Sequence, residues 1–360
     1  MNKEINAVIL GASGYTGVEL VRLLLRHDSV SIRALTANSH AGESYESVFP
    51  HLGFNNFPGL IKNEEIDWDG IDVAFCALPH GTTQNVIKTI PKNIKVIDLS
   101  ADFRLDSPNI YSEWYGHEHW APELQKEAVY GLTEFYRDKI TKSRLVACPG
   151  CYPTAALIQL LPIVQANQID VDDIIIDAKS GVTGAGRSLK ETSLFSEIAE
   201  GIHPYGVAHH RHAPEIEQEI TKSFGRRVIV NFTPHLMPMN RGELVTTYVR
   251  CKKGISADDI RQSLKDRYEE EHFVRILDEG ILPSTRHVRG SNFVVISVVA
   301  DRIKDRVILI TAIDNLVKGS SGQAIQNMNL MFGFDEIMAL EQEPLFPYVL
   351  IIMRKICLIR

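Results

Sequence analysis

The first 150 residues alternate short apolar runs with segments of helical spacing. Apolar runs occupy residues 5–10, 30–35, 73–77 and 95–99, and residues 18–26 and 83–90 carry apolar side chains at helical intervals between them. Short buried strands that alternate with helices are typical of a parallel sheet covered by helices. The pattern therefore predicts an α/β domain over residues 1–150.

From residue 151 onwards the pattern changes to longer, amphipathic strands. They are expected at residues 173–179, 228–233, 244–250, 292–299 and 307–313, with a helix near 257–270. This favours an α+β second domain with a mixed or antiparallel sheet over residues 151–313. Residues 314–340 contain a helix expected to return to the first domain, and residues 341–360 form an atypical apolar tail.

Composition excludes several classes of protein. The 360 residues carry a net charge of −7, which argues against a broad nucleic-acid surface. Five cysteines, an odd number, suit a reducing compartment and do not form a disulfide scaffold. The N-terminus has no signal-peptide pattern, and no apolar stretch reaches the roughly 18 residues of a membrane span. We expect a cytoplasmic protein without a membrane or nucleic-acid partner.

A glycine turn follows the first strand and opens the first helix. Its spacing, G-x-x-G-x-x-G, is a variant of the dinucleotide-binding fingerprint, in which backbone approaches a pyrophosphate at the helix N-terminus. Its position after the first strand favours this interpretation over a turn that only packs a helix on a strand. The candidate cofactor residues here are Gly11, Ser13, Gly14, Tyr15, Thr16 and Gly17.

The end of the second strand indicates which dinucleotide is bound. NAD-binding chains usually place Asp or Glu there to hold the ribose 2′-hydroxyl, but residues 36–39 contain neither. The small hydroxyls of Thr36 and Ser39, with Arg33 nearby, could accept a 2′-phosphate instead. This favours NADP, bound as NADPH, over NAD.

The most reactive candidate is the cysteine pair at the domain boundary. Cys148 and Cys151 lie where a short strand, residues 145–147, turns into an apolar helix. Free N–H groups and the helix dipole would stabilise a thiolate there, as a nucleophile requires. A buried structural cysteine and a redox pair remain open as alternatives. A four-cysteine metal site is excluded because the other cysteines are isolated.

Two later loops and one arginine also carry candidate chemistry. Residues 180–187 follow a strand and contain three glycines, which let backbone approach a ligand, and Arg187, a fork for an anion. Residues 209–216 offer His210 as acid/base, with Glu215 to hold its tautomer. Adjacent His209 and His210 cannot easily point into one tetrahedral site, so no metal site is expected. Arg104 is a candidate anion clamp.

Together these motifs resemble the N-acetyl-γ-glutamyl-phosphate reductases of arginine biosynthesis. The resemblance runs in order from about residue 5 to about residue 340 and is most specific at residues 149–154 and 210–216. It implies a Rossmann NADP-binding domain and a catalytic domain like those of aspartate-semialdehyde and glyceraldehyde-phosphate dehydrogenases. Gln159 replaces a usually small residue, and the tail beyond about residue 347 has no counterpart in the resemblance.

The resemblance also implies roles for individual residues. Cys151 is the nucleophile that forms a thioester with an acyl phosphate, which leaves Cys148 without a catalytic role. His210 and Glu215 complete the catalytic set, and NADPH reduces the thioester to a semialdehyde in the third step of the pathway. The implied substrate-binding residues are Arg104, Arg187 and His212, and the implied further cofactor residues are Ser180, Gly181, Gly184 and Asn315. A homodimer or homotetramer is expected.

Two other functions remain open at this stage. A sister reductase could apply the same chemistry to aspartyl phosphate or carrier-bound aminoadipyl phosphate, because pocket shape decides the substrate. A non-catalytic NADP-binding sensor would keep the cofactor site but have no unusually reactive thiol.

Overall fold

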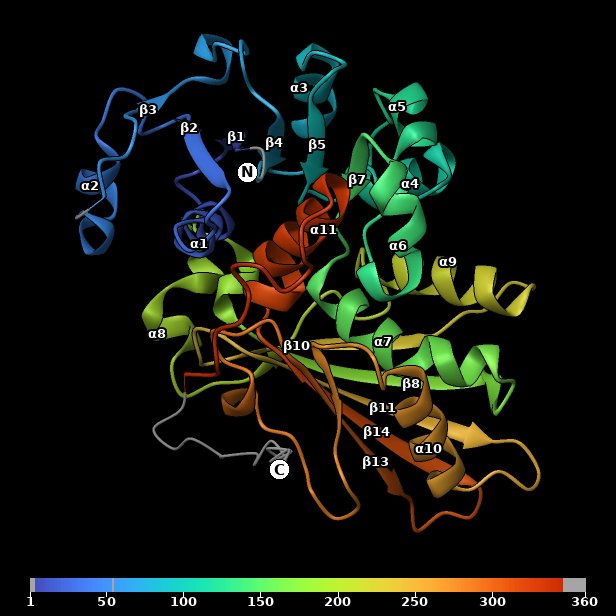
Figure 1. Ribbon diagram of the computed structural model, residues 1–360. Helices are drawn as coiled ribbons and strands as arrows, with labels where there is room; N and C mark the ends of the chain where they lie inside the picture. Colours follow the sequence, from blue (N-terminus) through green and yellow to red (C-terminus); the bar gives the residue numbers. More distant parts are fainter. Residues whose placement is uncertain (1–3, 54, 346–360) are drawn as a thin grey trace, which may run out of the picture.

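The computed structural model describes residues 4–53 and 55–345. It contains two sheets that face each other across a layer of helices, with α7 lying over one sheet and α11 under the other (Figure 1). Residues 346–360, which include most of the expected apolar tail, lie outside the described residues.

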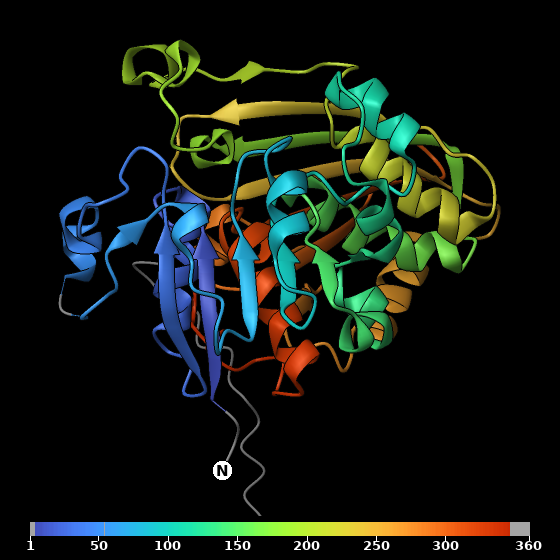
Figure 2. The same cartoon turned by 90° about the horizontal axis from the view of Figure 1, so that it is seen from above.

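The first sheet is entirely parallel, as the alternation of strands and helices predicts. Its strand order is β3-β2-β1-β4-β5-β7-β6, so the chain reverses direction across the sheet between β1 and β4. Ligands of such sheets bind at the carboxyl ends of the strands beside this reversal. The strands, seen nearly side by side in Figure 2, are β1 Ile5–Leu10, β2 Val30–Thr36, β3 Leu60–Ile61, β4 Val73–Cys76, β5 Lys95–Asp98, β6 Val129–Tyr130 and β7 Leu145–Ala147.

Helices connect these strands. Apolar side chains at helical spacing bury one face of α1 against the sheet, while its first turn stays close to the strand ends. The helices of this half are α1 Tyr15–Leu24, α2 Tyr45–Val48, α3 Thr83–Thr89, α4 Pro108–Tyr115, α5 Pro122–Glu127 and α6 Thr133–Lys142.

The second sheet is mixed, with strand order β12-β13-β14-β11-β8-β10-β9. The pairs β8–β10 and β12–β13 are parallel and the others are antiparallel, which confirms the expected mixed α+β architecture. Its strands are β8 Ile169–Gly181, β9 His203–Pro204, β10 Asn231–Met237, β11 Glu243–Cys251, β12 Val274–Ile276, β13 Val294–Ala300 and β14 Arg306–Ile313. Its helices are α7 Cys151–Gln165, α8 Phe195–Ile198, α9 Ala213–Phe224 and α10 Ala257–Arg267.

Helix α7 is the centre of the second core. Every residue from Tyr152 to Val164 is buried, and the helix packs against α9, α10 and the sheet. The unusual Gln159 is accommodated there, because its amide donates to Thr247 at 2.6 Å and accepts from Thr311 at 2.9 Å. The sheet thus holds the helix that begins at Cys151 rigidly in place.

After β14 the chain crosses back to the first sheet. A π-helical turn, Val317–Ser321, leads into α11 Gly322–Phe332, which packs against α6 and α1 in the core of the first domain. Within the residues described here, no helix is long and apolar enough to cross a bilayer.

Candidate active site

The two cysteines of the boundary motif occupy different environments. Cys148 is buried in the first core, where its sulfur accepts a hydrogen bond from Asn327 Nδ2 at 3.7 Å and burial raises the pKa of its thiol to about 12. Cys151 is the first residue of α7, after Gly150 at the N-cap, and is only partly buried. Both cysteines are free, and of the two only Cys151 lies at a helix N-terminus, so it remains the candidate nucleophile.

The electrostatics of Cys151 differ from what its position at a helix start predicts. Burial and the neighbouring Glu243 carboxyl raise the pKa of its thiol well above the ordinary value, whereas the Tyr152 N–H and the charge of Arg104 act in the opposite direction. The first-turn N–H lowers the pKa of the thiol as its position predicts, but desolvation and the nearby carboxyl group outweigh that effect in the unliganded protein. The thiol needs a proton acceptor before it can attack.

Glu215 holds the turn that carries Cys151. Its buried Oε1 accepts the Gly150 N–H at 2.8 Å and the Tyr130 hydroxyl at 2.8 Å, and Oε2 lies 3.5 Å from Arg104 Nη1. Among the described residues, no hydrogen bond joins Glu215 to His210 or His212, and its polar contacts are with the Gly150 backbone, Tyr130 and Arg104. Its expected role in holding an imidazole tautomer stays a prediction.

Arg104 is buried and reinforces the same turn. Its Nε donates to the Cys148 carbonyl at 2.7 Å and Nη2 donates to the Leu99 carbonyl at 3.3 Å. Nη1 faces His212 Nε2 at 3.5 Å. The guanidinium therefore places a positive charge near Cys151. Most of its N–H groups already donate hydrogen bonds within the protein.

The two histidines lie beside the nucleophile's turn. The backbone N–H of His212 donates to His210 Nδ1 at 3.1 Å, which places the proton of neutral His210 on Nε2. Burial, then the charge of Arg211, lowers the pKa of His210 to about 4, so its imidazole is neutral at neutral pH. Its ring contacts Tyr152, next to Cys151.

His212 is packed still closer to the turn. Its ring faces Gly150, and burial followed by the charges of His210 and Arg104 holds its pKa well below the ordinary value. Its Nδ1 is buried and has no hydrogen-bond partner in the part of the chain that the structure describes. Because Arg104 can only donate to Nε2, Nδ1 carries the proton and offers a free donor to a ligand.

Glu243, Tyr205 and Gly319 were not singled out in the sequence. The Tyr205 hydroxyl donates to the Tyr152 hydroxyl at 3.1 Å, and the charges of Cys151 and Glu243 raise the pKa of Tyr205 after the larger effect of burial. Gly319 packs directly on Cys151. Only Glu243 had a sequence signal, because period-2 alternation places it on the buried face of β11 with Val245.

The glycine turn has the shape of a dinucleotide site. Gly11 has a φ of +80°, and a Cβ there would lie 2.9 Å from the Ala77 carbonyl carbon; at Gly17 it would lie 2.6 Å from Ala12 Cα. At Gly14, by contrast, the nearest atom would be 3.5 Å away, so space remains beside the N-terminus of α1. The open Gly14 and the unpaired N–H groups of the first helical turn, residues 15–17, fit a pyrophosphate.

The two hydroxyls expected at the 2′-phosphate have different surroundings. Thr36 is fully buried, accepts the Gly11 N–H at 3.2 Å and donates to Asn63 at 2.6 Å, so its hydroxyl supports the turn. Ser39 is exposed at the strand end. Thr16 and Ser13 contact other parts of the chain: the Thr16 carbonyl accepts from Ser321 at 2.9 Å.

Arg187 does not lie beside Cys151. Its Nη1 donates to the Ser13 carbonyl at 2.8 Å and its guanidinium lies 4.8 Å from the centroid of the Phe49 ring. The sequence predicted Arg187 at the substrate phosphate. The structure instead places its guanidinium at the glycine turn of the cofactor site. The reason is that the loop after β8 extends towards the first domain.

The remaining cofactor candidates line the base of that loop. Asn315 accepts the Gly242 N–H at 2.9 Å and donates to Thr183 at 2.9 Å, which ties the start of β11 to the loop. Gly181 donates to the Gly242 carbonyl at 2.9 Å. Ser180 is buried, and its hydroxyl oxygen would lie 3.3 Å from a Cβ at Gly184.

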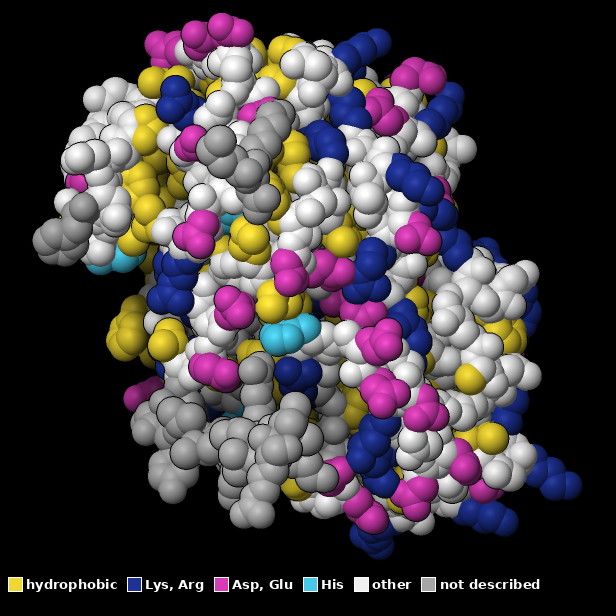
Figure 3. Space-filling model, viewed as in Figure 1, with side chains coloured by type: hydrophobic (Ala, Val, Ile, Leu, Met, Phe, Trp, Pro, Cys, Tyr) yellow, Lys and Arg dark blue, Asp and Glu magenta, His cyan; other side chains and the backbone are white. Residues whose placement is uncertain are grey.

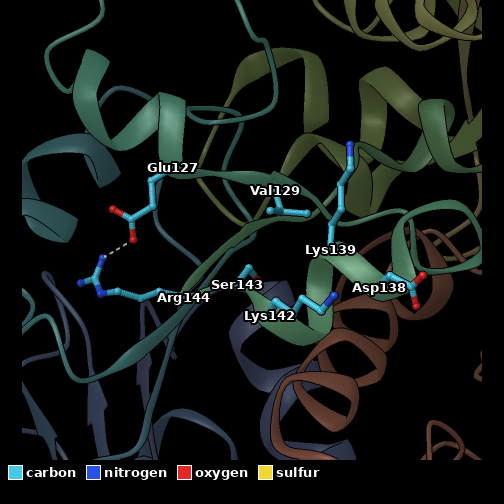
Figure 4. Close-up of a pocket in the computed structure, with 7 residues that line it drawn as sticks. All are labelled: Glu127, Val129, Asp138, Lys139, Lys142, Ser143 and Arg144. Atoms are coloured by element: carbon cyan, nitrogen blue, oxygen red, sulfur yellow. Dashed lines mark hydrogen bonds and ion pairs between the residues drawn. The ribbon is translucent and has the colours of Figure 1, made fainter.

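Other surface features contribute little. A surface hollow beside α6 contains none of the candidate site residues (Figure 4). Glu127 and Arg144 form an ion pair there at 3.3 Å. The hollow is lined by Glu127, Val129, Asp138, Lys139, Lys142, Ser143 and Arg144. Acidic and basic side chains are interspersed on the face seen in Figure 3. In the described part of the chain, no cluster of three or more His, Cys, Asp or Glu side chains is arranged to hold a metal ion.

Known proteins resemble this chain over nearly all of its length. The sequence model of the semialdehyde dehydrogenase NAD binding domain matches residues 6–143, and that of the semialdehyde dehydrogenase dimerisation domain matches residues 151–315. Aspartate semialdehyde dehydrogenase II from Vibrio cholerae, complexed with ASA, superposes with a TM-score of 0.69 at 19% identity, over 92% of this chain and 98% of that one. This likeness shows the fold.

Closer relatives show the family. N-acetyl-gamma-glutamyl-phosphate reductase from Rhodospirillum rubrum is 58% identical over 352 residues, 96% of this chain and all of the relative. The probable chloroplastic reductase of Arabidopsis thaliana is 55% identical over 96% of this chain and 86% of its own length. The turn before Cys151, the glycine turn and these sequence identities agree. The chain belongs to the N-acetyl-gamma-glutamyl-phosphate reductase family.

Proposed function

We propose that this protein reduces N-acetyl-L-glutamyl 5-phosphate to N-acetyl-L-glutamate 5-semialdehyde with NADPH, the third step of arginine biosynthesis from glutamate. The observation that carries the proposal is Cys151 at the start of α7, on a turn held by Glu215 and Arg104. Relatives with 53–58% identity are named for this reaction, which favours it over a sister acyl-phosphate reductase and over a non-catalytic sensor.

The chain's residues support a covalent mechanism. The thiolate of Cys151 attacks the acyl carbon and phosphate leaves, which gives a thioester on Cys151. In this mechanism neutral His210 and the Nδ1–H of His212, which has no partner among the described residues, would donate hydrogen bonds to oxygen atoms of the substrate. Collapse of the thiohemiacetal regenerates the Cys151 thiolate, with His210 assisting proton transfer at the substrate oxygen.

The cofactor site supports NADPH. When bound, NADPH supplies the hydride that reduces the thioester. Gly14 and the N–H groups at the start of α1 would hold its pyrophosphate. Arg187, at the Ser13 carbonyl, adds positive charge on the same side, and no carboxylate within residues 36–39 would repel a 2′-phosphate.

The assembly is proposed to be a homodimer or homotetramer. Large apolar side chains are exposed on the segment around α8, with Leu189 at 90% and Phe195 at 84% exposure. Such a patch is typical of a subunit interface, and the matching family domain is described as a dimerisation domain. The free cysteines of the described residues fit a cytoplasmic location.

The reverse reaction tests the function. Purified protein is given phosphate, NADP⁺ and either N-acetylglutamate semialdehyde or aspartate semialdehyde, and NADPH formation is followed. The proposal expects turnover with the N-acetylated aldehyde, retained by Cys148→Ser and lost in Cys151→Ser. Activity that prefers aspartate semialdehyde, or that survives Cys151→Ser, would contradict it.

A further inference from the structure

The carboxyl group of Glu243 is buried, and among the described residues it makes no hydrogen bond of standard geometry. Its side chain is fully buried at the start of β11, and neither Oε1 nor Oε2 has a partner of standard hydrogen-bond geometry. Alternation along β11 places it on the same buried face as Val245 and Val249. A carboxylate in such surroundings is costly, so its presence calls for a chemical explanation.

The sheet register brings Glu243 to the nucleophile. Glu243 pairs with Ser180 of β8 on one side and with Ile313 of β14 on the other. A Cβ on Gly319 would lie 3.3 Å from Ile313 Cδ1 and 2.7 Å from Cys151 Cβ, so both side chains pack around Gly319, where α7 and β14 are in contact. Glu243 lies opposite Ile313 in this register, close enough to Cys151 for its carboxyl to raise the pKa of the thiol.

The charges around the pair do not neutralise Glu243. Asp314 is the other carboxyl that acts on it, and Arg241 is engaged by Glu19 and Asp314 instead. Within residues 4–53 and 55–345, no lysine or arginine forms an ion pair with Glu243.

Two tyrosines and one arginine complete the charged and titratable surroundings. After the larger effect of burial, the charges of the thiol and of Glu243 both raise the pKa of Tyr152 and of Tyr205, and of the pair only the thiol is influenced by Arg104.

We propose that Glu243 is the base that takes the proton from the Cys151 thiol, a role that rests on the proposed function. The Sγ–H bond breaks, an O–H bond forms on the Glu243 carboxylate, and the resulting thiolate attacks the acyl phosphate. The proton then leaves with the phosphate, as HPO₄²⁻. After the thiohemiacetal collapses, the Cys151 thiolate takes up one proton from water, so one proton is consumed per turnover.

The acid–base properties of the site favour Glu243 over the imidazoles. Burial raises the pKa of Glu243 to about 8, near the pH at which a general base works best. Burial lowers the pKa of His210 to about 4 and holds that of His212 well below its ordinary value, so both are weaker acceptors. The two groups are coupled, because Glu243 raises the pKa of the Cys151 thiol and the thiol lowers that of Glu243.

The test is alkylation of Cys151 by iodoacetamide, which needs neither substrate nor cofactor. Rates are measured from pH 6 to 10 by peptide mass spectrometry for wild type, Glu243→Gln and Glu243→Asp. Glu217→Gln is the matched control, because Glu217 is a half-buried carboxyl on α9 that accepts the Val230 N–H at 3.2 Å and does not act on Cys151. Thermal unfolding and NADPH binding are recorded for each variant to verify folding.

The proposal expects Glu243→Gln to slow alkylation near pH 7.5 by about 10²-fold, within the range for loss of a positioned base. The pH–rate profile of alkylation in Glu243→Gln should shift to higher pH. Glu243→Asp should recover part of the alkylation rate, and Glu217→Gln should be alkylated as fast as wild type. Equal or faster alkylation in Glu243→Gln would overturn the proposal, because the carboxylate would then only repel the thiolate. Unchanged alkylation with a raised KM would instead make Glu243 a substrate-binding residue. If Cys151 of the wild-type protein is alkylated as expected but the protein has no reductase activity, the proposed function is refuted independently of the role of Glu243.

Discussion

Replacing Gly150 by alanine tests whether the contact between the nucleophile's turn and His212 is needed for activity. Gly150 has a φ of −64° and a ψ of 158°, an ordinary extended conformation that alanine adopts without strain. The only perturbation is steric. The added Cβ would lie 2.6 Å from Cε1 and 2.8 Å from Cδ2 of the His212 ring, and closer still to Nε2.

The size of the effect follows from how little room the ring has. Ordinary contacts of a Cβ begin at 3.4 Å, so the ring or the turn must move by about 1 Å. Arg104, Tyr152 and His210 all contact the ring and oppose that movement. Overpacking of this kind costs about 1–3 kcal/mol of the free energy of unfolding. A displacement of about 1 Å at a reacting group lowers kcat/KM by about 10²-fold.

The assay combines steady-state kinetics with thermal unfolding. Gly59→Ala is the control, because a Cβ there would meet its nearest atom, the Glu43 carbonyl oxygen, at 3.8 Å. In the double variant Gly150→Ala/His212→Ala the clash is absent, so the stability loss caused by the clash should disappear and the activity should equal that of His212→Ala alone. Wild-type kcat/KM and an unchanged unfolding temperature in Gly150→Ala would refute the steric argument.

Three further predictions follow from the site and the domain contact. NADPH should bind about 10- to 100-fold more tightly than NADH, as a gained charge-assisted interaction implies, and equal affinities in a fluorescence titration would contradict this. His210→Ala should lower kcat by about 10²–10⁴-fold, and a larger loss in His212→Ala would identify His212 as the more important imidazole. Arg241→Ala should lower the free energy of unfolding by about 3 kcal/mol, because it leaves buried Glu19 with Arg22 alone. Burial raises the pKa of Glu19, but its bonds to Arg241 and Arg22 bring it below the ordinary 4.5. The stability it contributes is therefore present above pH 4.5 and lost as the pH falls below that value, and acid unfolding of Arg241→Ala should show a weaker dependence in that range.

Features that depend on neighbours along the chain were determined by the sequence itself. The strand, glycine turn and helix at the N-terminus follow from apolar spacing and from glycines at residues 11, 14 and 17. Cys151 at the first turn of α7 follows in the same way, and the two motifs were enough to indicate the family. Local steric and hydrogen-bonding rules act over a few residues, so their outcome can be seen in the sequence.

Partnerships between distant segments were decided only by the tertiary structure. Glu243 faces Cys151 because the register of β11 between β8 and β14 puts the two together, and alternation alone could indicate burial but not the partner. Arg187 lies at Ser13 because its loop crosses to the first domain, and Glu215 binds the Gly150 N–H because α9 packs against α7. The thiol's raised pKa has the same origin: desolvation and a carboxylate from a distant strand outweigh the local effect of the helix terminus.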